Sequence, residues 1–118
     1  MKQQIITLEE CFPHLNDGGV LTIEDTHTSY MREYMAGFGQ RGTFMEYAKR
    51  TTDIPNQMFY GNILATDYVE RFKDLYSVAF YNSQVVFEKK HVDTFEIIDN
   101  GTSDLSILTH VKKYVPEA

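Results

Sequence analysis

The segment NDGGVLTIED, residues 16–25, decides how the chain is expected to fold. Its Asn-Asp-Gly-Gly half is a strong helix stop and turn, and the Val-Leu-Thr-Ile run that follows is typical of a short buried strand. Upstream, Ile5, Leu8, Phe12 and Leu15 recur at helical spacing, which predicts a helix over residues 3–15. A helix, a Gly-Gly turn and an apolar strand predict the second half of a helix–strand unit in an α/β fold.

The start of that helix carries no capping residue. No Ser, Thr, Asp or Asn precedes the helical pattern, which runs almost to Met1. We therefore interpret the helix as one that is cut at its beginning. Its only cysteine, Cys11, lies beside Phe12 and is expected to be a buried structural thiol rather than a nucleophile.

Downstream of the strand, turn residues and apolar spacing divide the chain further. Three glycines predict a loop over residues 31–42, and Thr43 with Glu46 form the capping box of a helix over residues 43–54. A short helix follows over residues 67–73, capped by Thr66 or by Asp67.

The last part of the chain begins with a hairpin. Residues 75–81 and 84–89 are rich in strand-forming residues and are separated by Asn82-Ser83, which predicts two antiparallel strands. Beyond them, residues 91–118 are expected to form a C-terminal extension. It has a weak strand pattern at 94–98 and helical spacing over 102–115.

Composition limits the classes of function. The chain has 118 residues, room for one small domain, and its 17 acidic against 11 basic residues give a net charge of -6. That balance argues against a nucleic-acid binder, which needs a basic face. No apolar run approaches the ~20 residues of a membrane span, and no secretion signal or disulfide pair is present, so the expected location is the cytoplasm.

Two acids end the predicted strand, and ligands bind at the carboxyl ends of strands in open α/β sheets. Neighbouring carboxylates repel each other unless a cation or hydrogen-bond donors compensate, and Mg²⁺ prefers oxygen ligands. Glu24 and Asp25 are therefore candidate metal ligands. The alternative is that one acid caps a backbone turn while the other is solvated.

Nearby residues are candidates for other roles. His27 could serve as a third ligand or as a general base, or it is an exposed loop histidine. Tyr30 and Tyr34 would line a substrate pocket or cover the edge of the sheet. Residues 37–42 have the spacing G-x-G-x-x-G, but they do not follow a strand, so they make a weak phosphate-binding motif.

Taken together, these segments resemble a known family. The Gly-Gly turn, the strand ending in Glu24-Asp25, the Thr28-Ser29-Tyr30 run and the hairpin ending in Glu88-Lys89 look like the late part of class I S-adenosylmethionine-dependent methyltransferases. The resemblance is greatest to the metal-dependent O-methyltransferases that act on macrolide sugars, and it covers residues 3–90.

The resemblance implies a fold that is α/β, the C-terminal half of a Rossmann-like sheet. Residues 1–90 would be a partial methyltransferase domain, with residues 20–25 as the fifth strand. Residues 75–81 and 84–89 would be the sixth and seventh strands, the seventh lying antiparallel between the fifth and the sixth. By the same resemblance, Glu24 and Asp25 match the acidic pair that binds Mg²⁺ in the family, and the loop at residues 37–42 matches a loop near the substrate.

Two parts of the family pattern have no counterpart in the sequence. The glycine-rich loop that binds S-adenosylmethionine and an Asp-rich motif ending in a histidine both belong to the first half of the fold. The complete family enzyme would methylate a hydroxyl of a small molecule, plausibly a sugar. For this chain the alternative is a non-catalytic remnant or a self-associating interaction module.

The missing half also predicts how the chain assembles. The outer neighbour of residues 20–25 would be an absent fourth strand, and the helix over residues 3–15 would lose packing partners. We therefore expect an open strand edge, exposure of Ile5, Leu8 and Phe12, and a chain that is not a stable monomer. The expected partner is a second copy, joined by two-fold pairing, or the missing N-terminal half.

Overall fold

Three strands form an antiparallel sheet in which the last strand of the described residues lies in the middle. In the computed structural model, which describes residues 1–61 and 63–93, the strands are β1 (Val20–Glu24), β2 (Leu75–Tyr81) and β3 (Gln84–Lys89). Their order is β1-β3-β2, and β3 is antiparallel to both neighbours. The strands and their order agree with the sequence-based prediction. The described part of the chain is thus a mixed α/β structure with an open three-stranded sheet.

The hairpin between β2 and β3 has the predicted two-residue turn. Tyr81 pairs with Gln84, and Ser83 takes a positive φ of 61°, the left-handed conformation that tight hairpin turns require. The other end of β2 is irregular, because the register shifts between Leu75 and Ser77. Val85 and Phe87 of β3 are fully buried, so β3 supplies the centre of the covered sheet face.

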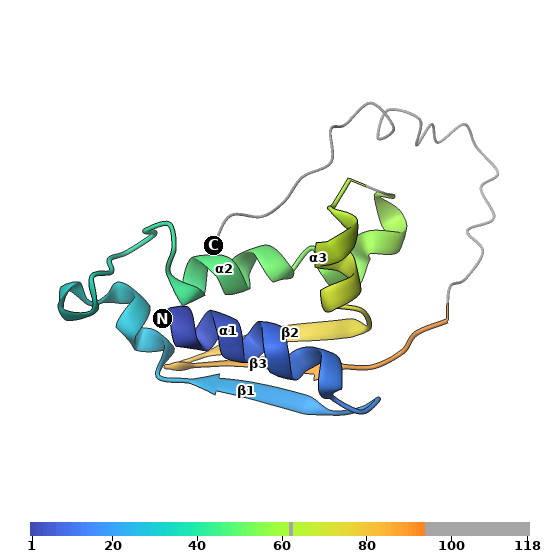
Figure 1. Cartoon of the computed structure of the whole chain (residues 1–118), viewed down its shortest axis with the longest axis horizontal. Coiled ribbons are helices and arrows are strands. Elements are labelled where there is room, and N and C mark those ends of the chain that lie inside the picture. Colours follow the sequence, from blue (N-terminus) through green and yellow to red (C-terminus); the bar gives the residue numbers. More distant parts are fainter. Residues whose placement is uncertain (62, 94–118) are drawn as a thin grey trace.

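The helices all lie on one face of the sheet (Figure 1). They are α1 (Lys2–Cys11), α2 (Phe44–Thr51) and α3 (Thr66–Arg71), with 3₁₀ turns η1 (Phe12–His14), η2 (Thr26–Tyr30), η3 (Arg32–Tyr34) and η4 (Ile54–Phe59). The predicted helix over residues 3–15 is therefore α-helical only to Cys11. Pro13 has no N–H to donate, and a 3₁₀ turn completes the segment.

Helix α2 begins as its sequence predicts and ends early. The Thr43 hydroxyl accepts a hydrogen bond from the backbone N–H of Glu46 at 3.3 Å, which is one half of the capping box. The Glu46 carboxylate instead accepts from Lys49 at 2.8 Å. The α-helix stops at Thr51, before the 3₁₀ turn that contains Pro55.

One expectation about the core is wrong. Ile5, Leu8 and Phe12 are buried in this chain, with 9%, 0% and 0% of their surface exposed. The Phe12 ring lies 5.8 Å from the ring of Phe72, and Phe72 also packs against Tyr47. Residues from α2 and the α3 region therefore cover α1 from within the described chain.

Two local expectations are also wrong. Cys11 is exposed, because the buried stripe of α1 continues from Leu8 to Phe12 and leaves Cys11 on its flank. The N-cap of α3 is Ala65 in an extended conformation, so neither Thr66 nor Asp67 occupies the capping position. Asp67 lies in the first turn instead, where its charge complements the helix dipole.

A buried hydroxyl ties the three helices together. The Tyr47 hydroxyl of α2 donates to the Glu9 carboxylate of α1 at 2.7 Å, and Arg71 of α3 lies 3.3 Å from the same oxygen. Burial and the hydrogen bond to Glu9 raise the pKa of Tyr47, which therefore stays a donor. The cluster fixes the helix layer over the sheet.

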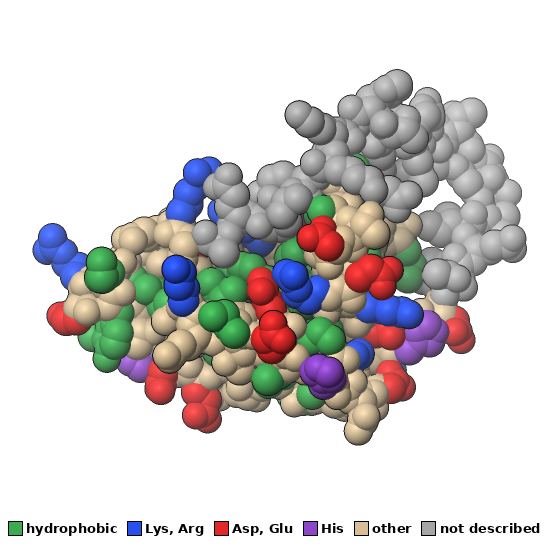
Figure 2. All heavy atoms as spheres, in the orientation of Figure 1, with side chains coloured by type: hydrophobic (Ala, Val, Ile, Leu, Met, Phe, Trp, Pro, Cys, Tyr) green, Lys and Arg blue, Asp and Glu red, His purple; other side chains and the backbone are tan. Residues whose placement is uncertain are grey.

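The weak strand at 94–98 and the helix over 102–115 lie outside the described residues, as does most of the expected C-terminal extension. No helix in residues 1–61 and 63–93 has the length and apolar character to cross a membrane. Acidic and basic side chains are intermixed on the face that Figure 2 shows.

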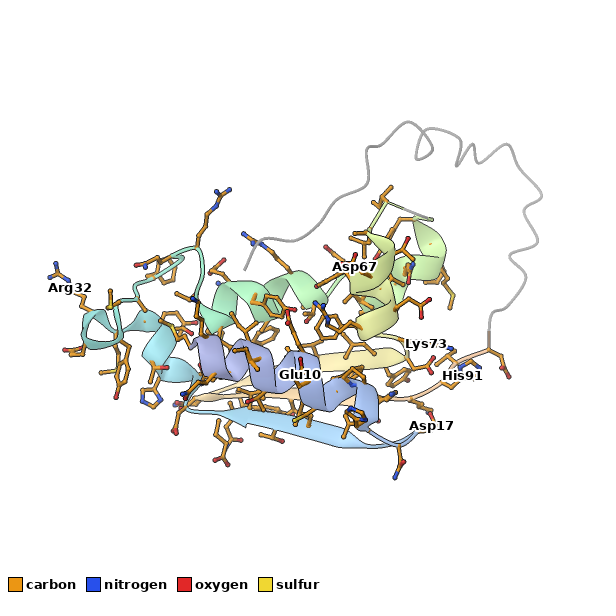
Figure 3. The ribbon with its side chains drawn as sticks, viewed as in Figure 1. Glu10, Asp17, Arg32, Asp67, Lys73 and His91 are labelled. Carbon is orange, nitrogen blue, oxygen red and sulfur yellow. The ribbon has the colours of Figure 1, made fainter. Side chains whose placement is uncertain are left out.

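A charged cluster holds the chain just after β3. The Nδ1 atom of His91 lies 3.1 Å from Asp74, and its Nε2 atom lies 3.2 Å from Asp93. The His91 backbone N–H donates to Asp17, in the turn before β1, at 2.6 Å. Figure 3 shows His91 and Asp17 at the same end of the sheet. The hydrogen bond and charge of Asp74, with a smaller effect of Asp93, raise the pKa of His91.

The cluster predicts a pH dependence of stability. A raised pKa in the folded state means that His91 contributes most below its unfolded pKa of 6.5. The contribution is lost as pH rises through the higher folded value. Thermal unfolding from pH 5.5 to 8.5 should therefore show a fall in Tm that His91→Gln reduces. His14→Gln, an exposed histidine, is the control, and an identical pH profile for His91→Gln and the parent chain contradicts the prediction.

Candidate functional site

The end of β1 positions the two acids. Glu24 is the last strand residue and belongs to the exposed positions of the strand, alternating with buried Ile23. Asp25 follows with φ 57° and ψ 35°, a left-handed conformation that aspartate tolerates better than most residues. The chain then enters η2. Both carboxylates are exposed at the point where the strand stops.

Three elements hold this backbone in place. The Gln4 side-chain amide of α1 donates to the carbonyl oxygens of Glu24 at 2.8 Å and of Asp25 at 3.2 Å. The N–H of Thr26 donates to the Ser83 carbonyl in the β2–β3 turn at 3.2 Å. The Thr28 hydroxyl donates to the Asp25 carbonyl at 3.0 Å. Polar backbone groups at the strand end are thereby satisfied.

His27 lies beside the hairpin turn. Its Nδ1 atom is 2.6 Å from the Ser83 hydroxyl oxygen, within hydrogen-bond distance. That contact orients the ring and leaves Nε2 for another partner. The side chain is exposed to solvent. Such a histidine can accept a proton from a bound hydroxyl if an acceptor molecule lies against Nε2.

The carboxylates fit a hard cation in kind but not in number. Mg²⁺ prefers near-octahedral oxygen coordination, and Glu24 and Asp25 supply two carboxylate groups. Within residues 1–61 and 63–93, no group of three or more His, Cys, Asp or Glu side chains is placed to hold a metal ion. A cation here would take most of its ligands from water or from another molecule.

The two candidate pocket tyrosines lie on an exposed, aromatic segment. The Tyr30 ring stacks against the Phe38 ring with centroids 6.4 Å apart. Tyr34 belongs to η3 and is half exposed, and Met35 and Phe38 are 88% and 89% exposed. The structure thus brings Tyr30 next to Phe38, a residue that the sequence interpretation did not single out.

Ser29 connects this segment to the helix layer. Its hydroxyl is buried and accepts a hydrogen bond from the Met45 backbone N–H, at the second position of α2, at 3.2 Å. The first N–H groups of a helix have no partner within the helix, so Ser29 satisfies one of them. Sequence reasoning missed Gln4, Ser29 and Ser83 as positioning residues, because their partners lie far away in the chain.

A groove of larger volume than the surface beside the acids lies elsewhere in the described residues. It has a volume of about 820 Å³ and is lined by apolar side chains of η4, α3 and β2, among them Ile54, Val69 and Leu75. Leu75 pairs with Lys89 of β3, at the end of the sheet opposite Glu24. This groove is therefore not part of the site at the end of β1.

Comparison with known proteins gives no assignment. No protein-family model matches the chain, and no curated protein matches it.

The role of Ser29 gives a testable expectation. Ser29→Ala leaves the part-buried Met45 N–H at the start of α2 without its acceptor, which typically costs about 1 kcal/mol. Urea denaturation should show that loss in the free energy of unfolding. Thr52→Ala removes an exposed hydroxyl that donates to the Lys49 carbonyl, where water can replace it, and should change stability by less than about 0.5 kcal/mol. Equal effects of the two substitutions would show that Ser29 does not fasten the segment to α2.

Proposed function

We propose that the chain is the C-terminal half of a metal-dependent O-methyltransferase that uses S-adenosylmethionine and acts on a hydroxyl of a small molecule, with a sugar as the favoured acceptor. The observation that carries the proposal is the sheet. Its third strand lies antiparallel between two strands that run parallel to each other, and the acidic pair stands at the end of the first. The resemblance of residues 3–90 implies this arrangement.

The reaction proposed for the complete enzyme sets the roles of its groups. A hydroxyl oxygen of the acceptor forms a bond to the methyl carbon, the bond between that carbon and the sulfonium sulfur breaks, and the hydroxyl proton goes to a base. A divalent cation bound to the acceptor oxygen would lower the pKa of the hydroxyl. Glu24 and Asp25 would supply two of the ligands to that cation.

His27 is the residue of this chain proposed to take the proton. Its contact with Ser83 orients the ring beside the strand end where the acceptor would lie. Tyr30 and Tyr34 are proposed to contact the acceptor from the segment that follows. The binding of S-adenosylmethionine is not assigned to any residue of this chain, since the described residues offer no glycine-rich loop after a strand.

A second candidate is an interaction module without catalysis. The exposed side of β1 favours it, because that strand pairs on one side only among the described residues. In this case Glu24 and Asp25 would be solvated acids at a turn, and the chain would act through the partner it binds.

The metal role of the acidic pair can be tested directly. Two carboxylates with water in the remaining positions should bind Mg²⁺ or Mn²⁺ weakly, with a Kd on the order of millimolar. NMR titration should shift or broaden the resonances of residues 24–30, and Asp25→Asn should remove most of the effect.

Asparagine is a suitable replacement because it also tolerates the left-handed backbone at this position. Asp67→Asn changes an exposed acid on α3, away from the strand end (Figure 3), and should leave the titration unchanged. Unchanged resonances at residues 24–30, or the same titration for Asp25→Asn and the parent chain, would contradict the metal-binding role of the acidic pair.

The division of the fold predicts how the methyl donor behaves. The chain alone should give no saturable heat in a calorimetric titration with S-adenosylmethionine, because residues 1–61 and 63–93 contain no glycine-rich loop that follows a strand. Micromolar, saturable binding would contradict the assignment of this chain to the C-terminal half. Weak Mg²⁺ binding without donor binding is the combined result expected of the proposed half-enzyme.

A further inference from the structure

A groove lies beside the second half of β1. It has a volume of about 340 Å³ and is lined by residues of α1 and of β1, two elements that lie one above the other in Figure 1. The residues that line it are Gln3, Gln4, Thr7, Thr22, Ile23 and Glu24. β1 is at the edge of the sheet, with β3 as its single paired neighbour among the described residues.

The backbone of β1 presents hydrogen-bonding groups to this groove. In an antiparallel pair, alternate residues direct their N–H and C=O groups toward the partner strand and away from it. Because the Lys89 N–H donates to the Gly19 carbonyl, Leu21 and Ile23 are in phase to face β3. Val20, Thr22 and Glu24 then face outward. The bond from Gln4 to the Glu24 carbonyl agrees with that phase.

The Gln4 side chain supplies a further hydrogen-bond acceptor beside this strand edge. Its Nε2 atom is used by the carbonyls of Glu24 and Asp25, while its Oε1 atom is buried and has no donor among the described residues. A buried acceptor without a donor costs roughly 1–3 kcal/mol. A backbone N–H of a strand lying in the groove would relieve that cost.

From these contacts we propose that the groove between α1 and β1 binds an extended polypeptide strand from outside this chain, which adds to the sheet beside β1. The strand would exchange backbone hydrogen bonds with Val20 and Thr22 and donate one N–H to the Oε1 atom of Gln4. This is recognition by strand addition, in which the backbone supplies affinity and alternate side chains supply specificity.

The edge is not blunted against such a partner. Val20, Leu21, Thr22 and Ile23 include no proline or lysine, which are the residues that commonly protect edge strands. Glu24 and Asp25 carry two negative charges at the end of β1, and the chain as a whole has a net charge of -6. A partner strand with lysine or arginine beside the two acids is therefore favoured over an acidic one.

A second copy of the chain fits the groove less well. In two-fold pairing each copy would present its own β1, and Val20–Glu24 contains no lysine or arginine to lie beside the acidic pair of the other copy. A basic strand from another protein supplies those side chains.

The test uses the full chain and a labelled nine-residue peptide of alternating valine and threonine with a lysine at each end. Fluorescence anisotropy should show saturable binding, and a peptide with glutamate at each end should bind at least fivefold more weakly. Thr22→Pro removes an outward N–H and should weaken binding at least tenfold. Thr22→Val keeps the N–H and should bind within about twofold of the parent chain.

A second substitution guards against misfolding. If Thr22→Pro fails to fold, Val20→Pro takes its place, because proline is tolerated at the first residue of a strand. Val20→Pro also removes an outward N–H and should weaken binding of the peptide in the same way. Gln4→Leu, which removes the acceptor, should lower affinity about fivefold, the equivalent of one hydrogen bond.

Three results would overturn the proposal. One is the absence of saturable binding by the parent chain, and another is unchanged binding by folded proline variants. The third is a dimer in sedimentation that becomes a monomer in Thr22→Pro, which would make a second copy the occupant. The inference rests on the fold and not on the methyltransferase proposal, so the metal and donor titrations fail or succeed independently of it.

Discussion

The pairing of β1 with β3 is the interaction on which the rest of the structure depends. It joins Val20 to Glu88 and Glu24 to Gln84, two segments at opposite ends of the described chain. Through this register the end of β1 meets the β2–β3 turn, so Thr26 reaches the Ser83 carbonyl and His27 reaches the Ser83 hydroxyl. The same pairing places Ile23 and Val85 under the helices. A slip by one residue would turn the buried side chains of β1 to the open face and move the acidic pair away from the turn.

Local patterns in the sequence predict the existence of the helices and strands better than their ends, because each element forms mainly through neighbouring residues. The strand predicted over residues 20–25, which the structure ends at Glu24, the hairpin across Asn82-Ser83 and the Thr43 cap all follow from spacing and turn chemistry. The burial of Phe12 could not be predicted in this way. The burial of Phe12 depends on contact with Phe72, which lies sixty positions later in the chain. The local sequence around Phe72 does not indicate that Phe12 is its packing partner. Cys11 shows the same limit, since one position along a helix decides between the buried stripe and its exposed flank.

The sequence predicts which residues form the candidate site, but it does not predict which residues hold them in place. Two acids at the end of an apolar strand are visible in the sequence, and the structure places them there. What holds them is a glutamine from the first helix, whose amide bonds two backbone carbonyls. No spacing rule links Gln4 to Glu24. The same amide carries the buried acceptor that makes the outer side of β1 a candidate binding surface, so one side chain serves both the strand end and the strand edge.

The position of β3 in the middle of the sheet has a consequence for synthesis. A ribosome makes β1 first and β3 last, with the whole of residues 25–83 between them. At about 5–20 residues per second, several seconds pass before the central strand exists. During that time β1 lacks β3, its one paired neighbour among the described strands, and the sheet face beneath the helices is incomplete. The nascent chain is therefore most vulnerable to aggregation before β3 emerges, when the apolar strand β1 is still unpaired.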